Sequence, residues 1–196
     1  MYVYTPNKLN YHLTNKRPEF NPNNYLSVAA AFTAKDYIST SGLLILEGNT
    51  IFKLFHDSLT GGCIIGEKSI KIVTQIENID SLKKSIITNR ESYFQQALLV
   101  YKNKLIKWNQ PNGDKKVQRR ALIEFNNQFS ICESSAGVDV ETFTLDLIKL
   151  GVKNAIYLDM GGWSEGWYKS VDGKQIKIGD NFSSTLLQTN WIYLSE

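Results

Sequence analysis

The sequence predicts a single α/β domain of the α+β type, in which a mixed, largely antiparallel sheet packs against one or two helices. Its 196 residues, 42% hydrophobic and 21% charged, suffice for one buried core. Short apolar runs alternate with turn-forming residues, which predicts hairpins. One amphipathic segment in the last third of the chain carries helix start and stop signals. No repeat or low-complexity linker interrupts residues 1–196, so one domain is expected.

The first elements are expected to be strands. Residues 25–32 form a compact apolar run that predicts a buried strand. Two later pairs of apolar runs are separated by short polar turns, which predicts antiparallel pairing. These pairs are residues 42–46 with 50–54, and residues 63–66 with 70–73.

The middle of the chain mixes signals. Residues 80–96 are helical in part, because Leu82, Ile86 and Ile87 are spaced as on one helix face. Two further hairpins are expected, about the turns Lys102-Asn103 and Asn126-Asn127, with a surface loop between them. The strands of these hairpins are residues 97–101, 105–108, 117–125 and 128–132, and the loop is residues 109–116.

The clearest helix runs from about Asp139 to Leu150. Asp139 can cap its start, Val138 and Phe143 can form a hydrophobic staple, and Gly151 supplies a left-handed stop. Residues 155–158 then form a short buried strand that leads into the turn 159–164, Asp-Met-Gly-Gly-Trp-Ser. This helix-strand-turn unit is the most informative part of the sequence.

Composition narrows the classes of function. The net charge is only +3 and the lysines are spread along the chain, so nucleic acid is not an expected partner. No apolar run approaches the roughly 18 residues of a membrane-spanning helix. Residues 1–6 lack the basic start and apolar centre of a secretory leader. Both a leaderless protein and a chain whose leader was trimmed fit this start.

Metal and thiol chemistry are weakly supported. Cys63 and Cys132 are far apart and outside any C-x-x-C pair, so two buried free thiols are favoured over a disulfide. His12, expected at the surface, and His56 are the only histidines, which leaves no zinc-type ligand spacing. No metal or cofactor is therefore expected, although a bound calcium stays open.

The turn 159–164 allows two interpretations. A carboxylate held at a strand end beside Gly161 and Gly162, whose backbone amides can approach a ligand, suits an anionic or sugar ligand. Alternatively, Asp159 only caps the turn and the glycines supply positive φ angles. Residue types alone leave both interpretations open.

Three parts of the sequence share a resemblance. Residues 151–164 read Gly-Val-Lys-Asn-Ala-Ile-Tyr-Leu-Asp-Met-Gly-Gly-Trp-Ser. They resemble the signature of the phosphodiester glycosidase family, a helix ending in Leu-Gly and then Ala-x-x-Leu-Asp-Gly-Gly-Gly-Ser-Ser. Residues 118–122 resemble the family's Pro-Arg-Thr-Ala-Leu strand, which puts Arg119 on the family arginine. Residues 28–32 and 42–48 resemble its Asn-x-Gly-x-Phe segment and the hairpin after it. The resemblance covers residues 25–168.

The resemblance implies hydrolysis of a sugar phosphodiester, the bond from which family members remove N-acetylglucosamine. Arg119 would clamp the phosphate, and Asp159 would act as base or nucleophile at the anomeric carbon. Glu165 is the second carboxylate available and Glu133 the third. The expected substrate-binding residues are Gly161, Gly162, Trp163, Ser164, His56 and Trp167.

Several assignments keep an alternative. His56 lies near a glycine pair and can donate to phosphate, but a lone loop histidine is more often structural. Gln95 and Gln96 line the pocket or sit on an exposed strand, and the exposed strand is slightly favoured.

Departures from the signature favour a different function. Met160 and Trp163 replace a glycine and a serine, and alanines replace the early asparagine and glycine. A non-catalytic glycan or sugar-phosphate binding module on the same fold is therefore the alternative. A structural protein with tryptophan interface anchors is a third reading. Family members act outside the cytoplasm, which implies a periplasmic or secreted place for this chain, whereas the missing leader leaves the cytoplasm open.

Overall fold

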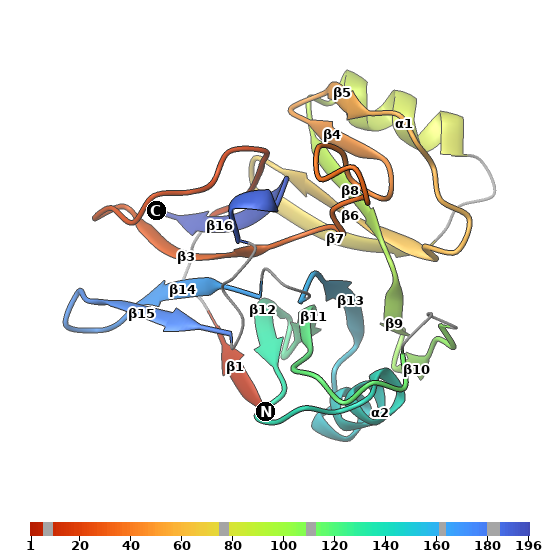
Figure 1. Ribbon diagram of the computed structural model, residues 1–196. Coiled ribbons are helices and arrows are strands. Elements are labelled where there is room, and N and C mark those ends of the chain that lie inside the picture. The colour runs from red at the N-terminus through yellow and green to blue at the C-terminus, as the bar shows by residue number, and fades with distance from the viewer. Residues whose placement is uncertain (6–9, 75–78, 109–112, 161–163, 180–184) are drawn as a thin grey trace.

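The computed structural model describes residues 1–5, 10–74, 79–108, 113–160, 164–179 and 185–196. Across these residues it contains 16 strands in three antiparallel sheets and two α-helices (Figure 1). Within the described ranges no sheet closes into a barrel. The structure therefore confirms the α+β class expected from the sequence, with three sheets where one was expected.

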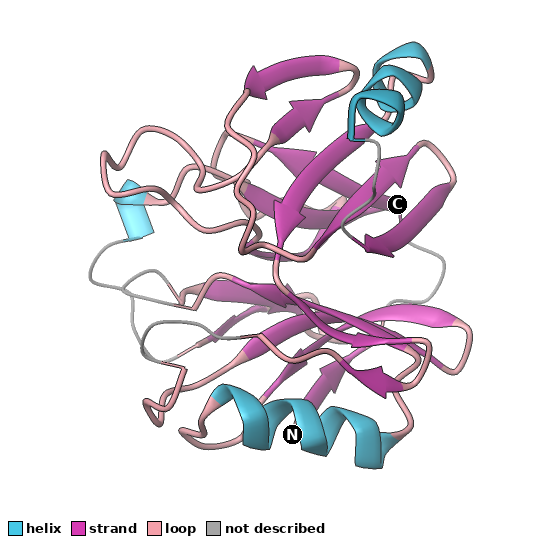
Figure 2. Cartoon of the chain, turned by 90° about the vertical axis from the view of Figure 1, so that its right-hand side faces the viewer, coloured by secondary structure: helices cyan, strands magenta, loops and turns pink. Residues whose placement is uncertain are grey.

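The first sheet has the strand order β1-β12-β11-β13-β9-β10. Its strands are β1 (Tyr2–Tyr4), β12 (Gln128–Glu133), β11 (Arg120–Phe125), β13 (Asn154–Leu158), β9 (Leu98–Tyr101) and β10 (Lys104–Leu105). The helix α2 (Val140–Leu150) covers one of its faces, at the bottom of Figure 2.

The second and third sheets cover the opposite face. The second has the order β15-β14-β3-β16-β2, from β15 (Gln175–Ile178), β14 (Gly166–Lys169), β3 (Asn24–Ala29), β16 (Trp191–Ser195) and β2 (Asn10–Thr14). The third has the order β5-β4-β8-β6-β7, from β5 (Asn49–Phe52), β4 (Leu44–Leu46), β8 (Ser92–Gln96), β6 (Gly61–Gly66) and β7 (Ser69–Thr74). The helix α1 (Ile79–Thr88) lies on the third sheet, and a short 3-10 helix, η1 (Thr185–Leu187), precedes β16.

The core is layered because the strands alternate their side chains between two faces. Leu122 and Ile156 of the first sheet pack against Val28 of the second and Phe94 of the third, and all four are fully buried. On the other face of the first sheet, Phe143 is one of the helix residues that pack on the strands. The structure is thus built as helix, sheet, paired sheets and helix.

Local signals in the sequence predicted the central elements well. Asp139 caps α2 by accepting a hydrogen bond from the Thr142 backbone N–H, and Gly151 ends the helix with a φ of 87°. Asn126 and Asn127 turn the β11–β12 hairpin with φ values of 50° and 59°. Both cysteines are free and buried, as favoured. Neither helix in the described ranges is long and apolar enough to cross a membrane.

Other expectations were wrong or incomplete. Residues 80–96 were expected to be helical in part, and α1 confirms this for Ile79–Thr88; Ser92–Gln96 instead form β8, which lies between β4 and β6 in the third sheet. Gln95 and Gln96 are therefore buried, and the exposed strand favoured for them is corrected. His12, expected at the surface, lies half-buried in β2 and stacks on Tyr193 with 4.7 Å between ring centroids. The sequence analysis did not predict the strands of the second sheet apart from β3.

Candidate functional site

The pairing of β11 with β13 brings Arg119 and Asp159 to the same end of the first sheet. The last pair in this ladder is Arg120 opposite Leu158. Arg119 comes directly before β11 and Asp159 directly after β13, so the antiparallel register sets the two residues side by side. Both side chains are buried, with 3% of each residue exposed.

The Arg119 side chain extends over the face of the sheet that α2 covers. Its Nε donates to the Val138 carbonyl oxygen at 3.0 Å, and Nη1 donates to the Tyr157 hydroxyl at 3.1 Å. Its Nη2 donates to the carbonyl oxygens of Lys115, at 2.6 Å, and Gly113, at 3.4 Å. The guanidinium therefore fastens the chain before α2 to the sheet, and protein groups take four of its five N–H bonds.

Asp159 is tied to the segment that follows β3. Its backbone N–H donates to the Ala30 carbonyl oxygen at 2.9 Å, and its Oδ2 accepts from the Thr33 backbone N–H at 3.2 Å. Burial raises the pKa of the Tyr157 hydroxyl; the positive charge of Arg119 opposes this shift and the negative charge of Asp159 adds to it. Tyr157 thus lies within electrostatic reach of both residues.

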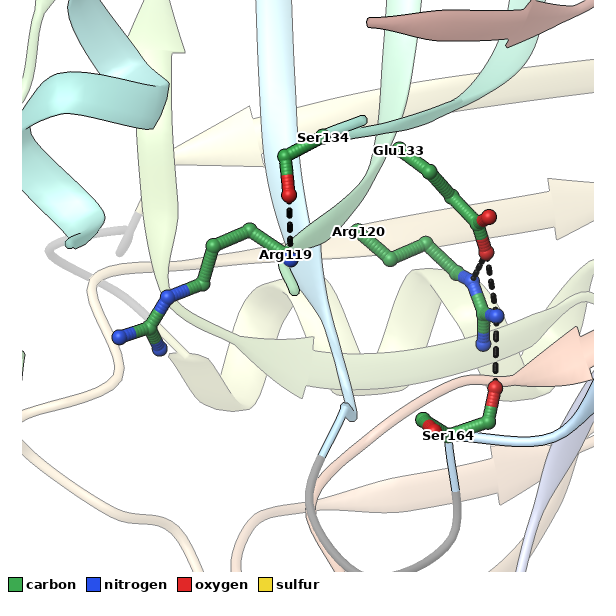
Figure 3. Close-up of polar contacts among 5 residues, drawn as sticks. All are labelled: Arg119, Arg120, Glu133, Ser134 and Ser164. Carbon is green, nitrogen blue, oxygen red and sulfur yellow. Dashed lines mark hydrogen bonds and ion pairs between the residues drawn. The ribbon is translucent and has the colours of Figure 1, made fainter. Parts of the chain in front are cut away.

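Arg120 points the other way, into the space between the sheets, as Figure 3 shows. Its Nε donates to Glu133 Oε1 at 2.5 Å, and its Nη2 donates to the Ser164 carbonyl oxygen at 2.7 Å. Arg120 is fully buried and Glu133 is 2% exposed, so this ion pair is screened little by water. Ser164, at the exit of the turn 159–164, is therefore held by Arg120. Glu133 is committed to this ion pair.

The remaining predicted residues lie in several settings. The Glu165 carboxylate forms ion pairs with two side chains, Arg17 at 2.7 Å and Lys177 at 3.5 Å. The Trp167 ring is buried and packs edge-on against Phe20, with centroids 5.3 Å apart. Trp167 thus belongs to β14 of the second sheet, and Glu165 directly precedes this strand. Gly161, Gly162 and Trp163 lie outside the described residues.

His56 lies in the loop between β5 and β6 of the third sheet. Its Nδ1 lies 2.8 Å from the Ser58 Oγ, and its backbone N–H donates to Gln95 Oε1 at 3.0 Å. Among the described residues, the hydrogen bonds of His56 therefore join it to its own loop and to β8, and none of them reaches Arg119 or Asp159.

The sequence analysis missed Thr33, Gln188 and Asn190. All three are at most 9% exposed, and they are hydrogen-bonded around the segment that contacts Asp159. A polar residue in an apolar neighbourhood, such as Asn190 directly before the run Trp-Ile-Tyr-Leu, is the only signal that points to this set. The pairing partner of that residue is not visible in the sequence.

Described residues line two cavities of similar size, among others. The larger, about 940 Å³, lies between the first and second sheets and includes the rings of Tyr4, Phe20, Tyr25 and Tyr168. The smaller, about 840 Å³, lies beside the start of α2 and includes Trp108. Arg119 and Asp159 line neither cavity. In the described ranges, no group of three or more His, Cys, Asp or Glu side chains is arranged to hold a metal ion.

Comparisons of the sequence with known proteins find no match, whereas comparisons of the structure show which folds it resembles. No family model matches the sequence, and no curated protein matches it either. The fold is similar to that of a hydrolase catalytic domain and of a hypothetical protein. The first is zebrafish N-acetylglucosamine-1-phosphodiester α-N-acetylglucosaminidase, a catalytic domain auto-inhibited by its pro-peptide, with a TM-score of 0.64 and 12% identity. The second is from Synechocystis, with a TM-score of 0.64 and 9% identity.

The coverage of these matches is unequal. The zebrafish match covers 88% of this chain and 64% of the zebrafish chain, and the Synechocystis match covers 96% and 57%. The chain thus spans less than two thirds of either neighbour. At these identities the similarity shows the fold, which agrees with the fold implied by the family resemblance.

Proposed function

We propose that this chain hydrolyses a glycosyl phosphodiester, with Asp159 as base or nucleophile. The observation that carries the proposal is the pair of residues at one end of the first sheet. A buried carboxylate stands there beside a buried arginine, in a fold similar to that of a sugar-phosphodiester hydrolase. Buried ionisable groups of opposite charge held side by side are candidates for an active site.

The chemistry fits a phosphate leaving group. A phosphate monoester departs with little need for a strong general acid, so neutralisation of its charge matters more. Arg119 supplies a fixed positive charge, and described residues accept from four of its five N–H groups, so one N–H of Nη1 is not used by them. We therefore assign Arg119 one hydrogen bond to a phosphate oxygen, plus its charge. The other proposed contacts to substrate are Glu165, Ser164, Trp167, His56 and, from the turn, Gly161, Gly162 and Trp163.

The proposal is tested by comparing two substrates with the same sugar. The chain is expected to release the sugar and a phosphomonoester from a hexosamine phosphodiester, followed by ³¹P NMR, and to cleave the matching aryl glycoside much more slowly. Equal rates on the two substrates would remove the argument for a phosphate-binding arginine. We also propose an extracytoplasmic place of action, as the family resemblance implies.

The second candidate is a glycan-binding module without catalysis. The cavity of about 940 Å³ favours it, because four aromatic rings and the Pro22 ring line it. Its size and aromatic lining are typical of small-ligand sites, and aromatic faces suit the apolar faces of sugars. Binding of both test substrates by calorimetry, with hydrolysis of neither, would favour this function.

A further inference from the structure

Residues 30–33, which follow β3, lie between Asp159 and the segment 188–190. On one side they contact Asp159 through the Ala30 carbonyl oxygen and the Thr33 backbone N–H. On the other side they contact two buried amide side chains, Gln188 and Asn190. The shape of this short segment therefore fixes how Asp159 is held.

Asn190 pairs with Ala31 as if it were part of a strand. Its Nδ2 donates to the Ala31 carbonyl oxygen at 3.0 Å, and its Oδ1 accepts from the Ala31 backbone N–H at 2.7 Å. Asn190 is fully buried, so both bonds are shielded from water. Removing them would leave backbone groups of Ala31 unpaired in the interior, which is costly.

Gln188 extends this arrangement to Thr33. Its Nε2 donates to the Asn190 carbonyl oxygen at 2.8 Å, and its Oε1 accepts from the Thr33 hydroxyl at 3.0 Å. The Thr33 hydroxyl also lies 3.2 Å from the Thr189 Oγ1. Thr33 therefore joins the two sides: its hydroxyl binds the amides, and its backbone N–H binds the Asp159 carboxylate at 3.2 Å.

From this geometry we propose that Gln188 and Asn190, the amide bracket, are positioning residues for Asp159. They hold residues 30–33 so that the Thr33 N–H donates to one carboxylate oxygen and fixes the orientation of the Asp159 side chain. This inference rests on the proposed function for its effect on turnover. The bracket itself consists of hydrogen bonds, so its effect on residues 30–33 can be tested without any substrate.

The test compares two substitutions at Thr33. Thr33→Val keeps the branched shape and the backbone N–H but removes the hydroxyl that the bracket binds, whereas Thr33→Ser keeps the hydroxyl. Hydrogen exchange of the Thr33 amide and steady-state kinetics are measured on both. Thr33→Val is expected to speed amide exchange and lower kcat about five- to tenfold, the scale of one lost hydrogen bond, with KM nearly unchanged. Thr33→Ser should behave like the wild type.

Thr144→Val is the matched control, because it also removes a buried hydroxyl, which donates to the Val140 carbonyl oxygen at 2.8 Å within α2. It is expected to lose stability while the Thr33 amide and kcat stay unchanged. Wild-type exchange in Thr33→Val, or equal losses in Thr33→Val and Thr33→Ser, would overturn the bracket. A wild type that hydrolyses no sugar phosphodiester would overturn the proposed function alone, and amide exchange would still decide whether the bracket exists.

Discussion

Arg119 and Arg120 are neighbours in sequence and both are buried, yet their guanidinium groups have different kinds of partner. Arg119 lies on the face that α2 covers and binds mainly backbone carbonyl oxygens of loops. Arg120 lies between the sheets, where its partners are the Glu133 carboxylate and the Ser164 carbonyl oxygen (Figure 3). Strand alternation separates the two side chains, and the groups available on each face decide the partner.

This difference divides the work at the end of the first sheet. Arg120 and Glu133 fasten the exit of the turn 159–164 from inside the molecule. Arg119 stands beside Asp159 and is the arginine that we propose contacts the substrate. The account therefore expects stability to depend more on Arg120 and turnover more on Arg119.

The largest effect on stability is expected from Arg120→Met. It would leave the Glu133 carboxylate buried without its cationic partner, which costs about 3–5 kcal/mol of the free energy of unfolding. The double variant Arg120→Met with Glu133→Leu should recover much of this loss, because both charges of the pair are removed. Urea denaturation measures the free energy of unfolding of both variants. A single variant as stable as the wild type would show that Glu133 does not need Arg120 for stability.

A smaller loss of stability, with a clear loss of turnover, is expected from Arg119→Lys. Lysine keeps the charge but cannot reproduce the fork that binds several carbonyl oxygens, so unfolding should become easier by about 2 kcal/mol. The value of kcat/KM for a sugar phosphodiester should fall at least about tenfold, since a misplaced charge neutralises the leaving group poorly. Unchanged kinetics with the same loss of stability would make Arg119 purely structural.

The smallest effect is expected from Gly151→Ala, which touches neither arginine. Gly151 has a φ of 87° and no neighbour within 4 Å of an added Cβ, so only backbone strain of about 1 kcal/mol is expected. Thermal denaturation should show this modest loss while kcat/KM stays at the wild-type value. A fall in activity would show that turnover follows global stability and would weaken the comparison between the arginines.

The sequence could predict those parts that local signals determine. The cap at Asp139, the stop at Gly151 and the asparagine turn at 126–127 each rest on residues close in the chain. The proximity of Arg119 and Asp159 at the end of the sheet depends instead on the pairing of β11 with β13. Which face each arginine takes depends on the exact start of β11, and boundaries are the least reliable part of such predictions.

The rest depends on contacts between distant parts of the chain. Asn190 binds Ala31, and β16 joins β3 to β2, so the second sheet forms only when both ends of the chain meet. Gln95 and Gln96 are polar and were therefore expected at the surface. They are buried because β4 and β6 pair with β8 on either side, and these strands are distant in the sequence. No local pattern encodes such partners, and a polar residue in a short run reads as exposed.

The central claim, that Asp159 carries out the chemistry, is tested most directly by Asp159→Asn. Asparagine keeps an oxygen that can accept from the Thr33 N–H, and it removes the negative charge and the basicity. With a hexosamine phosphodiester as substrate, we expect kcat to fall by a factor on the order of 100 or more while the melting temperature barely moves. A variant that keeps its turnover but loses stability would contradict the account and leave Asp159 as a structural cap.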